Sequence, residues 1–215
     1  MHHLEHEMSY RGKDIVSKLK DYTIVVCGCG AIGSNLIVNM IRQGFENITV
    51  VDNDRIEDHN RGMQIWGKRE VGSKKVQVMK NIAFASMGIK INVIDQRLTE
   101  SNIKKINWPE LENLIVIDSF DNSESRGIVT DFCKERKIDC LHIGLAEGYG
   151  EVVWNERYIV PKGNNGPDVC EYPLSRNICM MSAIVGIETI IQYVESGNKV
   201  SRSITLGDFK ILELE

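Results

Sequence analysis

The glycine-rich turn after the first apolar run constrains the fold of this chain more than any other feature. Residues 22–28 (YTIVVCG) predict a short buried strand, and apolar positions recur at helical spacing from Ala31 to Gln43. Between them lie the three glycines of a G-x-G-x-x-G pattern, Gly28, Gly30 and Gly33. A second strand is predicted at 47–52, so these elements form a right-handed βαβ unit with parallel strands.

Strand-like and helix-like segments continue to alternate beyond this unit. We predict helices at 74–87 and 123–136 and strands at 91–95, 113–119 and 138–144. This alternation indicates an α/β fold built on a doubly wound, Rossmann-like and mostly parallel sheet. Its ligands should sit at the carboxyl ends of the strands.

The last third of the chain has a different pattern. Short antiparallel strands are predicted at 148–154 and 156–160, followed by a loop at 161–176 that is rich in turn-forming residues and predicted to be mobile. An apolar helix at 177–197 is expected to be buried on several sides. We expect the tail at 203–215 to form a hairpin that closes the sheet.

The first 20 residues are interpreted as the N-terminal arm of a single domain that covers 1–215. His2, His3 and His6 are expected to belong to a disordered or artificially added tail rather than to a metal site. No uncharged apolar run reaches the roughly 18 residues of a membrane span, and the N-terminus lacks the apolar core of a signal peptide. We therefore expect a cytoplasmic protein that has no membrane partner.

Charge and cysteine content argue against two further kinds of site. The formal net charge is -4 and the basic residues are scattered, so nucleic acid is not an expected partner. The six cysteines include no C-x-x-C pair. They are expected to be free thiols, and no zinc site is predicted.

The glycine turn and the acid after the second strand together predict an adenine nucleotide. Gly28 allows a tight turn, Gly30 lets the backbone approach a phosphate, and Gly33 allows close packing of helix and strand. Phosphate charge would lie at the N-terminus of the helix. Asp52 follows Gly33 by 19 residues, where a carboxylate can accept both ribose hydroxyls. A tight turn without a ligand and an NAD-dependent dehydrogenase both remain open at this point.

The segment from 51 to 77 is unusually polar for a dinucleotide-binding domain. Its polar side chains beyond Asp52 include Asp54, Asn60, Arg61, Gln64 and Lys75. Cations and amides beside a phosphate-binding turn suit the charge that develops on a triphosphate under attack. The alternative is a solvated loop before a basic helix start. Only about 70 residues follow the parallel strands, which leaves little room for the substrate domain of a dehydrogenase.

Five motifs, in order and at matching spacing, resemble the ThiF/MoeB/ubiquitin-activating family of ATP-dependent adenylyltransferases. They are GCGAIG at 28–33, DNDRI at 52–56, Asn60 with Gln64, VGSKKV at 71–76 and DSFDN at 118–122. The likeness covers nearly the whole chain from about residue 10. It implies a Rossmann-like adenylation domain that forms a homodimer.

The resemblance also implies a role for each matching residue. It places the nucleotide against Gly28, Gly30, Ile32, Gly33, Asp52, Asp54, Asn60, Arg61, Gln64, Lys75, Asp118, Asp121 and Asn122. Asp52 would bind the ribose, and Lys75 would stabilise the developing charge. Asp121 would hold Mg²⁺, with Asp118 as a second candidate, because an oxyanion that attacks an α-phosphate needs the like charges neutralised. Asp121 and Asn122 equally suit the N-cap of the helix at 123–136.

Two of these matches are incomplete. The family's Arg-Gln pair is Met63-Gln64 in this chain, so either Arg61 reaches the γ-phosphate from a shifted loop or the site is weakened. Tyr10-Arg11 loosely resembles an N-terminal arginine that dimers of the family lend to the partner's site.

A cysteine before the last helix accepts the activated acyl group in some members of the family, and Cys179 falls at this position. A helix N-terminus lowers the pKa of a thiol and so favours the nucleophilic thiolate. The alternative for Cys179 is a buried core residue. Cys170, in the 161–176 loop, is a second candidate nucleophile.

The resemblance implies an enzyme, an adenylyltransferase that uses ATP and Mg²⁺, with Arg61, Lys75, Asp121 and Cys179 as catalytic residues. It would activate the C-terminal carboxylate of a small ubiquitin-like or sulfur-carrier protein ending in Gly-Gly, and release pyrophosphate. The alternatives are an NAD-binding oxidoreductase and a non-catalytic nucleotide-binding relative, which Met63 would suit. The family also includes a tRNA-modifying enzyme with ATP-driven dehydration, but the acidic charge balance argues against that activity here.

Overall fold

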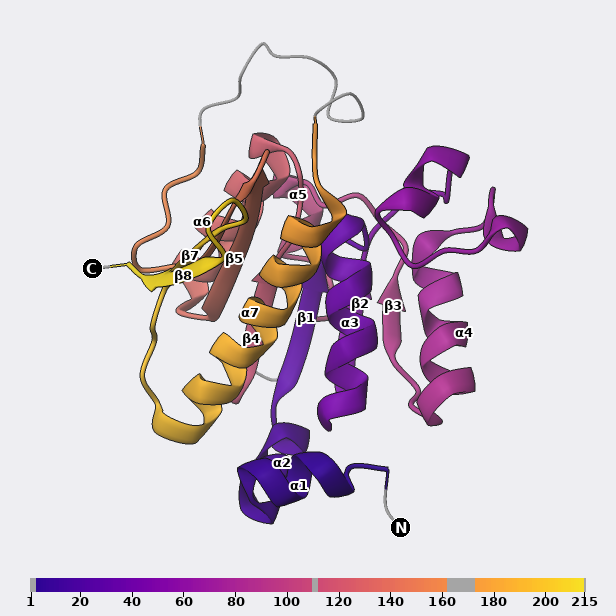
Figure 1. Cartoon of the computed structure of the whole chain (residues 1–215). Coiled ribbons are helices and arrows are strands. Elements are labelled where there is room, and N and C mark those ends of the chain that lie inside the picture. Colours follow the sequence, from indigo (N-terminus) through magenta and orange to yellow (C-terminus); the bar gives the residue numbers. More distant parts are fainter. Residues whose placement is uncertain (1–2, 110–111, 162–172, 215) are drawn as a thin grey trace.

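A computed structural model of the 215-residue chain describes residues 3–109, 112–161 and 173–214. Within this part of the chain, eight strands form one sheet in the order β3-β2-β1-β4-β5-β6-β7-β8 (Figure 1). The strands are β1 (Thr23–Cys27), β2 (Asn47–Val51), β3 (Asn92–Ile94), β4 (Leu114–Asp118), β5 (Asp139–Ala146), β6 (Tyr149–Trp154), β7 (Arg202–Thr205) and β8 (Lys210–Glu213). Strands β1 to β5 are parallel and the last three antiparallel, which confirms the predicted fold class.

Helices cover both faces of the sheet. They are α1 (Glu5–Arg11), α2 (Lys13–Lys18), α3 (Ala31–Gln43), α4 (Lys75–Met87), α5 (Glu100–Ile103), α6 (Ser123–Arg136) and α7 (Arg176–Ser196), with short 3₁₀ turns η1 (Leu19–Asp21), η2 (Asp58–Gly62) and η3 (Lys68–Glu70). Alternate residues of β1 enter two separate cores, as the period of a strand requires. Ile24 and Val26 pack with α3, α4 and α7, whereas Val25 and Cys27 pack with α5 and α6.

The long helix α7 belongs to the first of these cores. It has the length and hydropathy of a membrane-spanning helix, but 61% of its most apolar 18-residue window is buried inside the fold. Gly186 allows its close approach to the sheet, because a Cβ at this position would lie 2.5 Å from Ile143 on β5. The apolar composition of α7 is therefore explained by contacts with α3 and the sheet, as predicted for a helix buried on several sides.

Two predictions about local structure are wrong. Residues 156–160 form no strand but follow β6 as a turn and a segment without regular secondary structure. From residue 3 onward the N-terminal region is folded and is not a disordered tail: Leu4 is buried, and His6 lies within α1. Arg11 joins α1 to α7 by two hydrogen bonds to the Glu188 carboxylate and one to Glu7, so in this structure its guanidinium is held within its own chain.

The other predicted elements agree with the structure. The tail folds into the expected hairpin of β7 and β8 beside β6. His2, Cys170 and most of the predicted mobile loop lie outside the described residues.

Candidate functional site

The glycine turn after β1 leaves the N-terminus of α3 open. Gly28 has φ +102°, and a Cβ at Gly33 would lie 2.0 Å from the Gly28 carbonyl oxygen, so both positions require glycine. A Cβ at Gly30 would meet no atom within 4 Å. Among the described residues no side chain caps α3, and its first turn contains no acidic residue. The first N–H groups of the helix thus form a site for an anion.

The acid after β2 is bonded directly to this turn. Asp52 is 7% exposed; one carboxylate oxygen accepts the Cys29 N–H at 2.7 Å and the other accepts the Asp54 N–H at 2.7 Å. Burial raises the pKa of Asp52, and the nearby Lys75 charge and the two N–H groups offset this only in part. Each carboxylate oxygen has a further lone pair for a ribose hydroxyl. The bond to Cys29, which sequence patterns did not indicate, fixes Asp52 beside the turn.

Lys75 brings a buried positive charge to the same place. Its side chain is 7% exposed, and Nζ donates to Asp54 Oδ2 at 2.8 Å. Burial by itself would lower the pKa of Lys75, but the carboxylates of Asp52 and Asp54 outweigh it and raise the pKa above the ordinary value. Lys75 is therefore an ammonium at neutral pH. Its neighbour Lys74 points elsewhere and binds Asp95 and the Asn53 carbonyl.

The η2 segment places the remaining polar residues of the 51–77 region. Asn60 Oδ1 accepts the Glu57 N–H at 2.9 Å and so closes the turn. Arg61 donates to Asp58 at 2.6 Å on the surface, so its guanidinium is paired within the η2 turn, and its contact with a γ-phosphate stays a prediction. Gln64 accepts the Trp66 indole N–H, at 2.5 Å.

Met63 stands where the resemblance led us to look for an arginine, and it packs partly buried against the main core. Its carbonyl oxygen accepts Asn35 Nδ2 at 2.9 Å, which ties the segment to α3. Met63 thus serves packing at this position and supplies no charge.

The last residue of β4 is a fully buried carboxylate, and the segment that follows contains an exposed one. Asp121 is exposed and contacts Asn122 Nδ2 at 3.3 Å. Asn122 is the N-cap of α6, because its side-chain oxygen accepts the Ser125 N–H at 2.9 Å; this confirms the alternative for Asn122. Asp118, our second candidate for the metal, is 0% exposed.

Asp118 is instead part of an internal polar cluster. Its Oδ2 lies 2.9 Å from His142 Nδ1 and 3.5 Å from Arg126 Nη1, and its Oδ1 accepts the Phe120 N–H at 3.1 Å. The interior therefore uses both oxygens, and the assignment of Asp118 to the metal or nucleotide is corrected. His142 was not among the site residues predicted from the sequence; a histidine at a core position of the IDCLHIG strand was the available signal.

The structure contradicts the expectation of a reactive Cys179. The residue lies in the first turn of α7, as predicted, but it is 0% exposed. Burial raises the pKa of its thiol to about 11, and Arg176 offsets this only weakly. The desolvation penalty on the thiolate outweighs the favourable field of the helix N-terminus. Cys179 is a core residue in this structure, which was the alternative interpretation.

These features define a Rossmann-type α/β protein with an anion-binding turn and a buried carboxylate–ammonium group beside it. The chain belongs to the ThiF family, whose sequence pattern matches residues 4–187. This confirms the resemblance.

Similar proteins include a probable molybdopterin-synthase adenylyltransferase of Gracilaria tenuistipitata var. liui. The two are 30% identical over 193 residues, which are 83% of this chain and 51% of that protein. The tRNA threonylcarbamoyladenosine dehydratase of Haemophilus influenzae is 27% identical over 137 residues, 63% of this chain and 52% of the relative. This chain spans about half the length of both relatives.

Solved structures support the fold. MccB of E. coli has a TM-score of 0.80 at 19% identity, covering 98% of this chain and 67% of the other. TcdA of E. coli is a tRNA N6-threonylcarbamoyladenosine dehydratase solved in complex with ATP. It has a TM-score of 0.74 at 17% identity, and the match covers 90% of this chain and 94% of TcdA. At these identities the likeness concerns the fold alone.

Proposed function

We propose that this protein is an ATP- and Mg²⁺-dependent adenylyltransferase that activates the C-terminal carboxylate of a small ubiquitin-like or sulfur-carrier protein ending in Gly-Gly. Membership of the ThiF family and named adenylyltransferases among its relatives support the reaction class. The single observation that carries the proposal is the buried Lys75 ammonium, held by Asp54 next to Asp52 and the glycine turn.

The chemistry explains why such an ammonium is needed. A carboxylate oxygen attacks the α-phosphorus, a new P–O bond forms, and the bond to the β-phosphate oxygen breaks with release of pyrophosphate. Both reactants are anionic, so the transition state requires positive charge that is fixed in place before the reaction. Lys75, which is largely shielded from water, supplies that charge. The open N–H groups of α3 hold phosphate oxygens, and Asp52 holds the ribose.

Asp121 fits the magnesium ion of such a reaction. Mg²⁺ is typically held by one or two carboxylates together with substrate phosphates and water. The exposed Asp121 carboxylate is contacted only weakly, by Asn122. Among the described residues no group of three or more His, Cys, Asp and Glu side chains converges, so the donor set suits a cation that arrives with the nucleotide. When bound, the ion neutralises phosphate charge; Asp121 orients it.

Two neighbouring lysines allow a matched test of this function. Lys75→Met removes the buried charge at nearly constant length, whereas Lys74→Met removes a charge that binds Asp95. We expect carrier-dependent ATP–pyrophosphate exchange to fall by about 10²-fold or more in Lys75→Met and to change little in Lys74→Met. Thermal unfolding of both variants verifies that they fold.

Other outcomes would lead to another function. Calorimetry that shows clear preference for NAD over Mg-ATP would favour an oxidoreductase. A non-catalytic relative would be favoured by two results together. The protein would bind ATP but show no ATP–pyrophosphate exchange with any Gly-Gly carrier, and Lys75→Met would keep the biological activity of wild type.

A second candidate is an ATP-dependent tRNA dehydratase. The likeness to the tRNA threonylcarbamoyladenosine dehydratase of Haemophilus influenzae, at 27% identity, favours it, and the net charge of -4 opposes it. Binding of tRNA at physiological salt, with no exchange on carrier proteins, would select this activity. We also infer that the active unit is a homodimer, which sedimentation velocity would test.

A further inference from the structure

The polar cluster around Asp118 lies on the α6 face of the sheet, immediately behind the segment that carries Asp121. It comprises Asp118 at the end of β4, Arg126 on α6, His142 on β5, and Asn155 and Tyr158 after β6. All five side chains are buried. The function proposed above uses none of them.

The five side chains of the cluster are joined to one another by hydrogen bonds and by a stack of two rings. His142 Nε2 lies 3.0 Å from Asn155 Oδ1, opposite the bond from Nδ1 to Asp118. The Tyr158 ring stacks on the His142 ring with centroids 3.7 Å apart and planes 5° apart. Arg126 donates to the Tyr158 hydroxyl at 3.0 Å and to the Ile143 carbonyl at 2.8 Å. The side chains of four separate segments are thereby fixed relative to one another.

Stability alone is a weak reason for such a cluster. Charged groups buried together lose their hydration, and apolar residues of similar volume are often as stabilising as a buried ion pair. A satisfied polar network instead fixes one geometry. The geometry fixed here is that of the short segment 119–122.

This segment is tied down at both ends, at its start by the Asp118 side chain and at its end by the backbone of Arg126 in α6. At its start, Asp118 accepts the Phe120 N–H at 3.1 Å, and Ser119 Oγ donates to the Gly28 carbonyl at 3.1 Å. At its end, the Arg126 N–H donates to the Asn122 carbonyl at 3.1 Å, in the first turn of α6. Asp121 therefore lies on a short span that is tied to the glycine turn on one side and to the Arg126–Asp118 pair on the other.

We propose that His142 and Arg126 are positioning residues, which hold the Asp118 carboxylate so that Asp121 stands at a fixed place beside the glycine turn to receive the divalent cation of the bound nucleotide. The inference rests on the proposed function for the identity of the ligand. It goes further because it separates the role of the two aspartates of DSFDN: Asp121 meets the cation, and Asp118 works through the backbone behind it.

His142→Phe tests this role. Phenylalanine keeps the stack on Tyr158 and removes both ring-nitrogen contacts, whereas the amide of His142→Asn can keep a donor near Asp118. Calorimetry measures ATP binding with EDTA and with Mn²⁺, and the electron paramagnetic resonance spectrum of Mn²⁺ reports its environment. The Mn²⁺ gain is the factor by which Mn²⁺ increases the affinity for ATP. In His142→Phe we expect the metal-free affinity for ATP to stay within twofold of wild type and the Mn²⁺ gain to fall at least tenfold. His142→Asn should recover most of that gain.

A milder variant covers the case in which His142→Phe does not fold. Tyr158→Phe removes only the hydroxyl that Arg126 binds and should shift the Mn²⁺ gain in the same direction by a smaller factor. Tyr193→Phe, which removes a hydroxyl bonded to Asp139 at the far end of the sheet, should leave the gain unchanged.

The results distinguish failure of this inference from failure of the function. An unchanged Mn²⁺ gain in folded His142→Phe, or an equal loss of metal-free and metal-supported binding, would overturn the positioning role while ATP–pyrophosphate exchange by wild type still supports the function. Absence of ATP binding by wild type would overturn both.

Discussion

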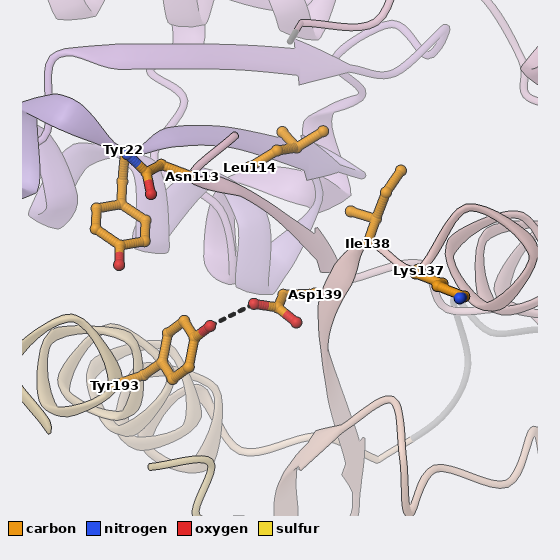
Figure 2. A pocket seen from close by; sticks show the side chains of 7 residues that line it. All are labelled: Tyr22, Asn113, Leu114, Lys137, Ile138, Asp139 and Tyr193. Atoms are coloured by element: carbon orange, nitrogen blue, oxygen red, sulfur yellow. Dashed lines mark hydrogen bonds between the residues drawn. The ribbon is translucent and has the colours of Figure 1, made fainter. Parts of the chain in front are cut away.

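The two ends of the parallel sheet both gather polar side chains, but within the described residues they differ in the helix ends that they receive. At the amino ends of the strands a cavity of about 130 Å³ is lined by Tyr22, Asn113, Leu114, Lys137, Ile138, Asp139 and Tyr193 (Figure 2). There Asp139 accepts the Tyr193 hydroxyl and the Lys199 ammonium. These side chains satisfy one another.

The difference follows from helix direction. In a parallel α/β sheet the helices begin at the carboxyl ends of the strands and end at the amino ends, as α3 and α6 do (Figure 1). The amino end therefore receives helix C-termini, which close through Gly44, Lys137 and Gly197 in the left-handed region. The carboxyl end receives N-terminal N–H groups. In the described part of the chain no side chain caps them at α3, which makes this end suited to an anion.

The largest effect is expected from glycines of the turn. Gly33→Ala would force a methyl group to within 2.0 Å of the Gly28 carbonyl oxygen, so we expect a loss of about 3 kcal/mol in unfolding free energy or failure to fold. Gly30→Ala meets no atom and should fold normally while its methyl group weakens ATP binding. Denaturant unfolding and calorimetry measure the two effects; a stable Gly33→Ala protein would disprove the close contact.

A second prediction concerns Cys179, which lies buried in the first turn of α7. Because the Cys179 thiol is buried and its pKa is raised to about 11, the thiolate fraction near neutral pH should be on the order of a hundredfold below that of a free cysteine. Alkylation of Cys179, followed by peptide mass spectrometry, should be slow at pH 7.5 and rise toward pH 11. Rapid labelling at neutral pH would restore the nucleophile hypothesis.

The smallest effect is expected at the amino end. Tyr193→Phe removes the hydroxyl bonded to Asp139 and should lower the unfolding free energy by about 1 kcal/mol, without a change in ATP affinity. Thermal unfolding and calorimetry provide the two readouts. A weakened affinity for ATP would mean that the two ends are coupled, contrary to the comparison.

Much of the carboxyl-end site could be predicted because its signals are local. The φ of Gly28, the contact of Gly33 and the N-cap at Asn122 each depend on a few neighbouring residues, and the sequence pattern indicated all three. The ends of β1, β2 and β4 follow from short apolar runs, so the positions of Asp52 and Asp121 in the fold were also predictable.

Side-chain partners were much less predictable. Lys74 and Lys75 are adjacent in sequence, yet one binds Asp95 and the other lies buried against Asp54. Asp118 and Asp121 lie in one motif, yet only the former is sealed against His142. In both pairs the outcome depends on which neighbouring element covers the residue, and periodicity does not encode that.

The sequence by itself determined the doubly wound sheet, the glycine turn, the acid that follows β2 and the family, because strand period, helix period and glycine geometry act over short stretches. Only the tertiary structure decided that Cys179 is a core thiol, that Arg61 pairs with Asp58, and that Asp118 is buried against His142. The physical reason is desolvation: whether a charge or thiol is active depends on how much water the packed fold leaves around it.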